Sequence, residues 1–159
     1  MSPVWPVSIP GCVFAILLAV SCAVPALAAE PCAPPGWTAV PILSAAVLPA
    51  EQPVRARLES VGALHLPAGT RSPSGGYGTV LAFDTTRPGR WRILLSAKAW
   101  IDVIEGSTPI ASVAHQHGAA CSPVRKMVDF EMNAGHHLIV LTGAPAQELV
   151  LEVAAQSAR

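Results

Sequence analysis

The chain has 159 residues, ten Lys or Arg and ten Asp or Glu residues, and therefore no formal net charge at pH 7. A chain of this length is expected to form one domain. All the charged residues lie after residue 29 and none of them form a basic block, which argues against nucleic acid as a partner. Val, Leu, Ile and Ala are abundant enough to bury a core, which excludes a disordered chain.

Residues 1–28 are predicted to be a helical signal peptide. They carry no charged side chain, contain an apolar run over residues 11–24 and end on Ala26-Leu27-Ala28, a pattern that signal peptidase cuts. The run is shorter than the ~20 residues of a membrane span, so we expect no transmembrane span in the mature chain. Lipid attachment at Cys22 and a retained anchor remain the alternatives, because no Lys or Arg precedes Gly11. The prediction is a periplasmic or secreted protein.

Residues 29–50 are predicted to be an extended, proline-rich leader, since prolines at 31, 34, 35 and 41 resist regular structure. Cleavage after Ala28 leaves Cys32 and Cys121 as the two cysteines of the mature chain. In an oxidising compartment, we expect them to form a disulfide that ties the leader to the loop after His117.

Residues 51–159 are predicted to form an all-β domain, an antiparallel β-sandwich of the jelly-roll-like kind. Its apolar residues recur with period two, as in Val54, Ala56 and Leu58, which alternate with charged neighbours. Gly- and Pro-containing turns separate the runs, and no segment has a helical period. The expected strands cover residues 54–58 with a continuation to 66, then 77–84, 91–95, 99–105, 110–114, 124–132, 137–142 and 149–153.

His115 and His117 are the candidate metal ligands. Two imidazoles at i and i+2 project from the same face of a strand and can reach one Cu, Zn, Ni or Fe ion. The set is incomplete, because zinc usually takes four ligands and non-haem iron takes two His and a carboxylate. Cys121 would be a third ligand only if the disulfide did not form. The alternative interpretation is that both histidines order a surface loop.

Three further residues are candidates for supporting roles. Asp102 shares a strand face with Trp100, and we expect a partly buried carboxylate there to accept hydrogen bonds from backbone or from an arginine. Arg125 and Lys126 could present cations near the histidine loop and bind an anion, or simply face water. A separate pair of histidines at 136 and 137 is expected to point to opposite faces of a strand, as two solvated turn residues.

About half of the chain, residues 75–153, resembles a family of small exported proteins of alphaproteobacteria. The resemblance lies in Gly76-Tyr77-Gly78, Ala99-Trp100-Ile101-Asp102-Val103, Ala114-His115-Gln116-His117-Gly118, Cys121-Ser122 and Arg125-Lys126-Met127-Val128-Asp129-Phe130. Members are often labelled homogentisate 1,2-dioxygenase. That label implies an iron-dependent ring-cleaving oxygenase, with His115, His117 and a distant carboxylate such as Asp102 or Asp129 on the iron.

Two functional hypotheses follow from the sequence. The first, which we favour, is a non-enzymatic binding module that holds a protein partner, a surface glycan or a metal ion through residues 115–126. The second is the iron-dependent oxygenase. They differ in whether an iron-loaded protein consumes oxygen in the presence of homogentisate.

Overall fold

The computed structural model describes residues 32–157, so the predicted signal peptide and the alternative site at Cys22 lie outside the described residues. The described chain is all-β apart from one 3₁₀ turn, Val61–Ala63 (η1). None of its helices is long and apolar enough to cross a membrane. The strands are β1 Val54–Arg57, β2 Glu59–Ser60, β3 Tyr77–Thr85, β4 Gly89–Leu95, β5 Trp100–Glu105, β6 Thr108–Ile110, β7 Ser112–Gln116, β8 Lys126–Met132, β9 Gly135–Ala144 and β10 Glu148–Ala155.

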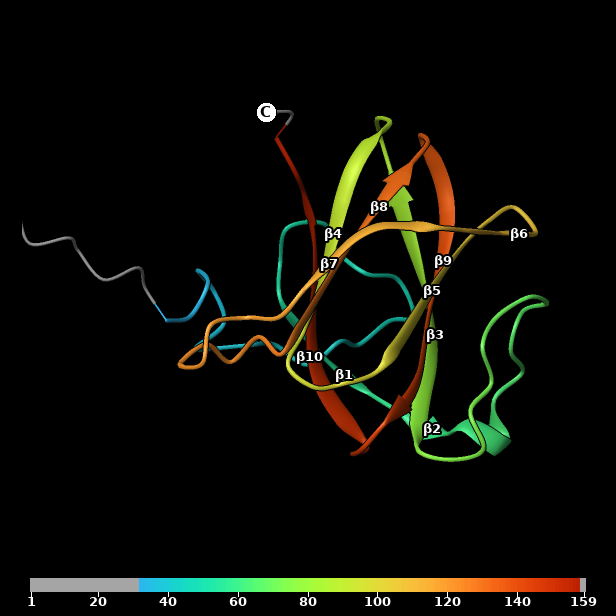
Figure 1. The fold of residues 1–159 in the computed structure, drawn as a ribbon, viewed down its shortest axis with the longest axis horizontal. Helices are drawn as coiled ribbons and strands as arrows, with labels where there is room; N and C mark the ends of the chain where they lie inside the picture. The colour runs from blue at the N-terminus through green and yellow to red at the C-terminus, as the bar shows by residue number, and fades with distance from the viewer. Residues whose placement is uncertain (1–31, 158–159) are drawn as a thin grey trace, which may run out of the picture. The chain divides into compact units, whose positions relative to one another are not determined.

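The strands form two five-stranded antiparallel sheets that pack as a sandwich (Figure 1), which confirms the predicted fold class. Sheet A has the order β1-β10-β4-β8-β7, and sheet B has the order β2-β3-β9-β5-β6. The turn between β5 and β6 is tight because Gly106 adopts a φ of 63°, a backbone conformation that favours glycine.

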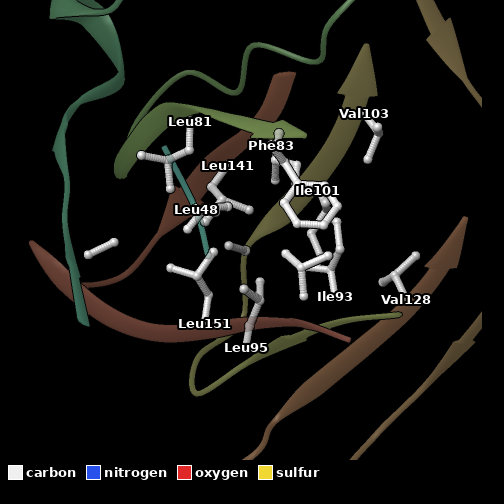
Figure 2. Packing of buried hydrophobic residues seen from close by; sticks show 14 of the residues in the cluster. Leu48, Leu81, Phe83, Ile93, Leu95, Ile101, Val103, Val128, Leu141 and Leu151 are labelled. Carbon is white, nitrogen blue, oxygen red and sulfur yellow. The ribbon is translucent and has the colours of Figure 1, made fainter. Parts of the chain in front are cut away.

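The alternation in the sequence sets which side chains face the core. In β4, Ile93 and Leu95 are fully buried between the sheets, whereas Arg92, which precedes Ile93, faces outward and pairs with Asp129 of β8. Figure 2 shows side chains from both sheets meeting in this core, including Phe83 of β3 in sheet B and Ile93 of β4 in sheet A. Burial of this apolar surface is the main source of stability for such a sandwich.

The leader is part of the sandwich rather than a free extension. Its residues 42, 47 and 50 form parallel bridges to β1, β3 and β10 in turn, so the segment passes from one sheet to the other and back. Leu48 is 4% exposed and inserts into the core, where Figure 2 shows it among Leu81, Leu141 and Leu151. The segment therefore supplies core side chains at an otherwise open side of the sandwich.

A second apolar cluster explains why the outer face of sheet A is not all polar. Leu94 and Val150 point away from the main core, and the leader residue Trp37 covers them. The Trp37 indole N–H also donates to the Glu152 carboxylate. An outward-facing leucine on an amphipathic strand is thus buried by a segment more than 50 residues earlier in the chain.

Two expected strands differ from the structure. The continuation to residue 66 is interrupted, because β2 ends at Ser60 and the chain enters η1. The expected strand 110–114 is divided between β6 and β7, which belong to different sheets. The chain changes sheets between Ile110 and Ser112, and an alternating pattern alone carries no information about which sheet a residue joins.

Candidate functional site

The two candidate metal ligands lie at the edge of sheet A. His115 is exposed on β7, opposite the buried Val128 of β8. His117 follows the strand, and its Nδ1 lies 3.2 Å from the Arg125 carbonyl oxygen, so Nδ1–H donates to that oxygen. Within residues 32–157 there is no group of three or more His, Cys, Asp or Glu side chains arranged to hold a metal ion. Metal binding at His115 and His117 stays a prediction.

The predicted Cys32–Cys121 disulfide is confirmed. The two Cα atoms are 5.4 Å apart and the residues are separated by 89 positions. Cys121 is therefore engaged in a covalent bond and does not offer a thiolate to a metal. The disulfide joins the leader to the β7–β8 loop, in which His117 follows β7 and Arg125 precedes β8.

Asp102 has the role expected of a partly buried carboxylate, since it accepts hydrogen bonds. Its Oδ1 accepts from the Trp100 indole N–H at 2.9 Å, and its Oδ2 accepts from the backbone N–H of Arg71 at 2.8 Å. The expectation of a backbone donor is confirmed. The identity of that donor was not predictable, because Arg71 lies 31 residues earlier in a loop.

Arg71 is held in place by three contacts. Its N–H is bound by Asp102, its carbonyl oxygen accepts from the Thr142 hydroxyl at 3.1 Å, and its guanidinium carbon lies 3.7 Å from the centroid of the Trp100 ring. A guanidinium over an indole face is attracted by the ring quadrupole. The loop that the sequence marks by its prolines and glycines is thus fastened to sheet B at Arg71.

Trp100 and its neighbours line an open pocket in the surface of about 390 Å³, which we call the Trp100 cavity. Its cationic members come from three places: Arg71 from the loop before β3, Lys98 from the β4–β5 connection and Lys126 from the start of β8. Its other lining residues are Pro73, Ala99, His117, Thr142 and Gly143. Residues from both sheets therefore meet at this end of the sandwich.

Lys126 is the more buried of the two predicted anion-binding cations. Its Nζ donates to the Ala99 carbonyl oxygen at 2.6 Å and lies 5.4 Å from the Trp100 ring centroid. Burial lowers the pKa of Lys126 below its ordinary value, and the negative charge of Asp102 opposes that shift. Arg125 is exposed and does not line the cavity, so the structure separates the pair that the sequence presented together.

The cations of the cavity are not neutralised by ion pairs. Within the described part of the chain, no carboxylate oxygen lies within 4.0 Å of the charged end of Arg71, Lys98 or Lys126. Asp102 is the nearby carboxylate, and its single negative charge offsets only part of the positive charge of the three cations. The cavity therefore presents positive charge that is available to a ligand.

A larger groove of about 790 Å³ lies on the outer face of sheet A. Four of its five charged side chains are paired across strands, the exception being the exposed Arg87: Arg92 forms two hydrogen bonds of 2.7 and 2.9 Å with Asp129, and Arg90 binds Glu131 at 2.9 Å. The hydrogen bond to Asp129, together with its negative charge, holds the pKa of Arg92 above its ordinary value. Because these groups satisfy one another, the groove offers less free binding capacity than the Trp100 cavity.

The histidines at 136 and 137 do face opposite sides of β9, as expected, but only one is solvated. His136 binds Asp84 at 2.8 Å on the surface. His137 is 1% exposed, so the expectation of a solvated turn residue is wrong for it. Its Nε2 lies 3.0 Å from the Asn133 carbonyl oxygen, and its Nδ1 has no hydrogen-bond partner among the described residues. The same Nε2 lies 3.2 Å from the Thr85 hydroxyl, so His137 helps to hold the β8–β9 turn against the end of β3.

No family model matches the chain, and no curated protein or solved structure matches it either. Function is therefore inferred from the geometry of the Trp100 cavity.

Proposed function

We propose that the protein is an exported binding module that holds an anionic ligand in the Trp100 cavity. The observation that carries this proposal is Arg71, whose backbone is fixed at both ends and whose guanidinium rests on Trp100 without a carboxylate partner among residues 32–157. A preorganised guanidinium binds a carboxylate or phosphate at lower entropic cost than a mobile one.

Lys98 and Lys126 add positive charge around the same cavity. Opposite charge raises the local concentration of an anion and the rate at which it binds. The Cys32–Cys121 disulfide supports the export part of the proposal, because disulfides persist in oxidising compartments. The pattern of residues 1–28 supports it independently.

The proposal keeps the favoured hypothesis of a non-enzymatic binding module and moves its centre. The sequence placed the binding edge at residues 115–126, whereas the free cations gather around Trp100, with His117 and Lys126 on one wall. The iron-dependent oxygenase and the family resemblance stay predictions, since no third metal ligand joins His115 and His117 within the described range.

The test is an anion titration of the purified mature protein, followed by NMR of the Trp100 indole N–H. Acetate, inorganic phosphate and hexanoate are added at constant ionic strength. We expect a saturable shift with at least one of them, its loss in Arg71→Gln, and its retention in Arg87→Gln, since Arg87 is an exposed arginine of the other groove. Absence of a saturable response to all three anions would contradict the proposal.

A further inference from the structure

The polar groups that the Trp100 cavity can still offer are almost all cationic. The Thr142 hydroxyl donates to the Arg71 carbonyl oxygen, and both Asp102 oxygens accept N–H donors. Thr142 is also fully buried and Asp102 is not among the residues that line the cavity, so few acceptors face a hydroxylated ligand there. A ligand rich in hydroxyl groups, such as a neutral sugar, would lose hydrogen bonds with water on entering.

Apart from its cations, His117 and Thr142, the lining of the cavity is apolar. It is provided by Pro73, Ala99, Gly143 and the Trp100 ring, which is 39% exposed. A large aromatic side chain left partly exposed on a strand, with cations above it, offers contact area for an apolar group. A small inorganic anion would use the cationic ends and leave this apolar surface in water.

Two of the cations lie at the Trp100 ring. The Arg71 guanidinium carbon and the Lys126 amine lie 3.7 and 5.4 Å from the same ring centroid, so they are at most about 9 Å apart. A single oxyanion with an apolar body can reach this cationic region while its body rests in the remaining cavity of about 390 Å³. That size lies within the range of small-molecule pockets.

We infer that the ligand of the Trp100 cavity is an amphipathic organic anion: one carboxylate or comparable oxyanion attached to an apolar body of several carbon atoms. This inference rests on the proposed function and adds the chemical class of the ligand. The oxyanion binds Arg71 and Lys126, and the apolar body covers Trp100 and Ala99.

The test is a ligand series measured by calorimetry on the purified mature protein. Acetate, butyrate and hexanoate share one carboxylate and differ in chain length. Burying one methylene strengthens binding about fourfold, so four buried methylenes give hexanoate an advantage over acetate of roughly a hundredfold or more. Hexanol and hexylammonium keep the body of hexanoate and remove or reverse its charge, and both are expected to bind at least tenfold more weakly.

Two variants separate the two parts of the ligand. Arg71→Gln is expected to weaken the binding of acetate and of hexanoate by the same factor, because both ligands carry the carboxylate. Trp100→Ala is expected to reduce the gain in affinity per methylene and to change the affinity for acetate less than the affinity for hexanoate. Arg87→Gln is the matched control and leaves every affinity unchanged. The ligand series measured on the protein without substitutions does not depend on how well the variants fold.

The outcomes distinguish this inference from the proposed function. If hexanoate gains less than tenfold over acetate, or if inorganic phosphate binds as tightly as hexanoate, the amphipathic class is overturned while an anion site stands. If hexanol or hexylammonium binds as tightly as hexanoate, or if no anion binds, both the inference and the proposed function are overturned.

Discussion

Loss of the Cys32–Cys121 disulfide is predicted to destabilise the fold by several kcal/mol. The bond closes a loop between residues 89 positions apart. The chain-entropy relation gives about 4.6 kcal/mol at 25 °C for a loop of that length. Both cysteines are exposed, so replacing them with serine removes little packing. The disulfide is therefore worth a large part of the 5–15 kcal/mol by which an ordinary domain is stable.

The assay is urea unfolding of the mature protein and of the Cys32→Ser/Cys121→Ser variant, followed by circular dichroism. With a denaturant slope of about 2 kcal/mol per molar urea, the midpoint is expected to fall by about 2 M. A single Ala120→Ser variant, at an exposed position next to Cys121, is the control for a local change. A midpoint lowered by less than about 0.5 M would refute the loop-closure reasoning.

Three further predictions concern the core, the cavity and the N-terminus. Leu48→Ala lowers the free energy of unfolding by about 2–5 kcal/mol in urea titrations, whereas Val47→Ala at an exposed position changes it by less than about 0.5 kcal/mol; equal effects would show that the leader does not enter the core. Burial lowers the pKa of Lys126, so between that lowered pKa and 10.5 the folded state binds fewer protons than the unfolded state. The stability of the protein relative to Lys126→Gln is therefore expected to rise with pH across this window, as measured by thermal unfolding. A stability difference that does not change with pH would contradict this. N-terminal sequencing of the exported protein is expected to begin at Ala29, and an intact Met1 or a lipidated Cys22 would exclude cleavage after Ala28.

The sequence was most informative where structure depends on near neighbours. The alternation of β4 placed Ile93 and Leu95 inward correctly, because the side-chain period of a strand is a local property. The cysteine pair was also predictable, since the predicted cleavage after Ala28 would leave two cysteines and one way to pair them.

The sequence was least informative where a contact joins distant segments. Nothing in the loop before β3 distinguishes Arg71 from the other arginines, and its role appears only when Asp102 and Thr142 bind its backbone. The burial of His137 likewise depends on Thr85 and Asn133. Trp37 resembles an ordinary leader residue until it covers the outward-facing Leu94. Each of these positions is determined by tertiary contacts, which periodicity does not encode.

The most direct test of the account is to map where an anion binds on the uniformly ¹⁵N-labelled mature protein. The two competing locations are the Trp100 cavity and the groove of paired charges around Arg92. With hexanoate as the probe, the account predicts the largest saturable shifts at the Trp100 indole N–H and at the backbone N–H of Arg71. Shifts centred on Arg92 and its neighbours, with the Trp100 and Arg71 resonances unmoved, would contradict it.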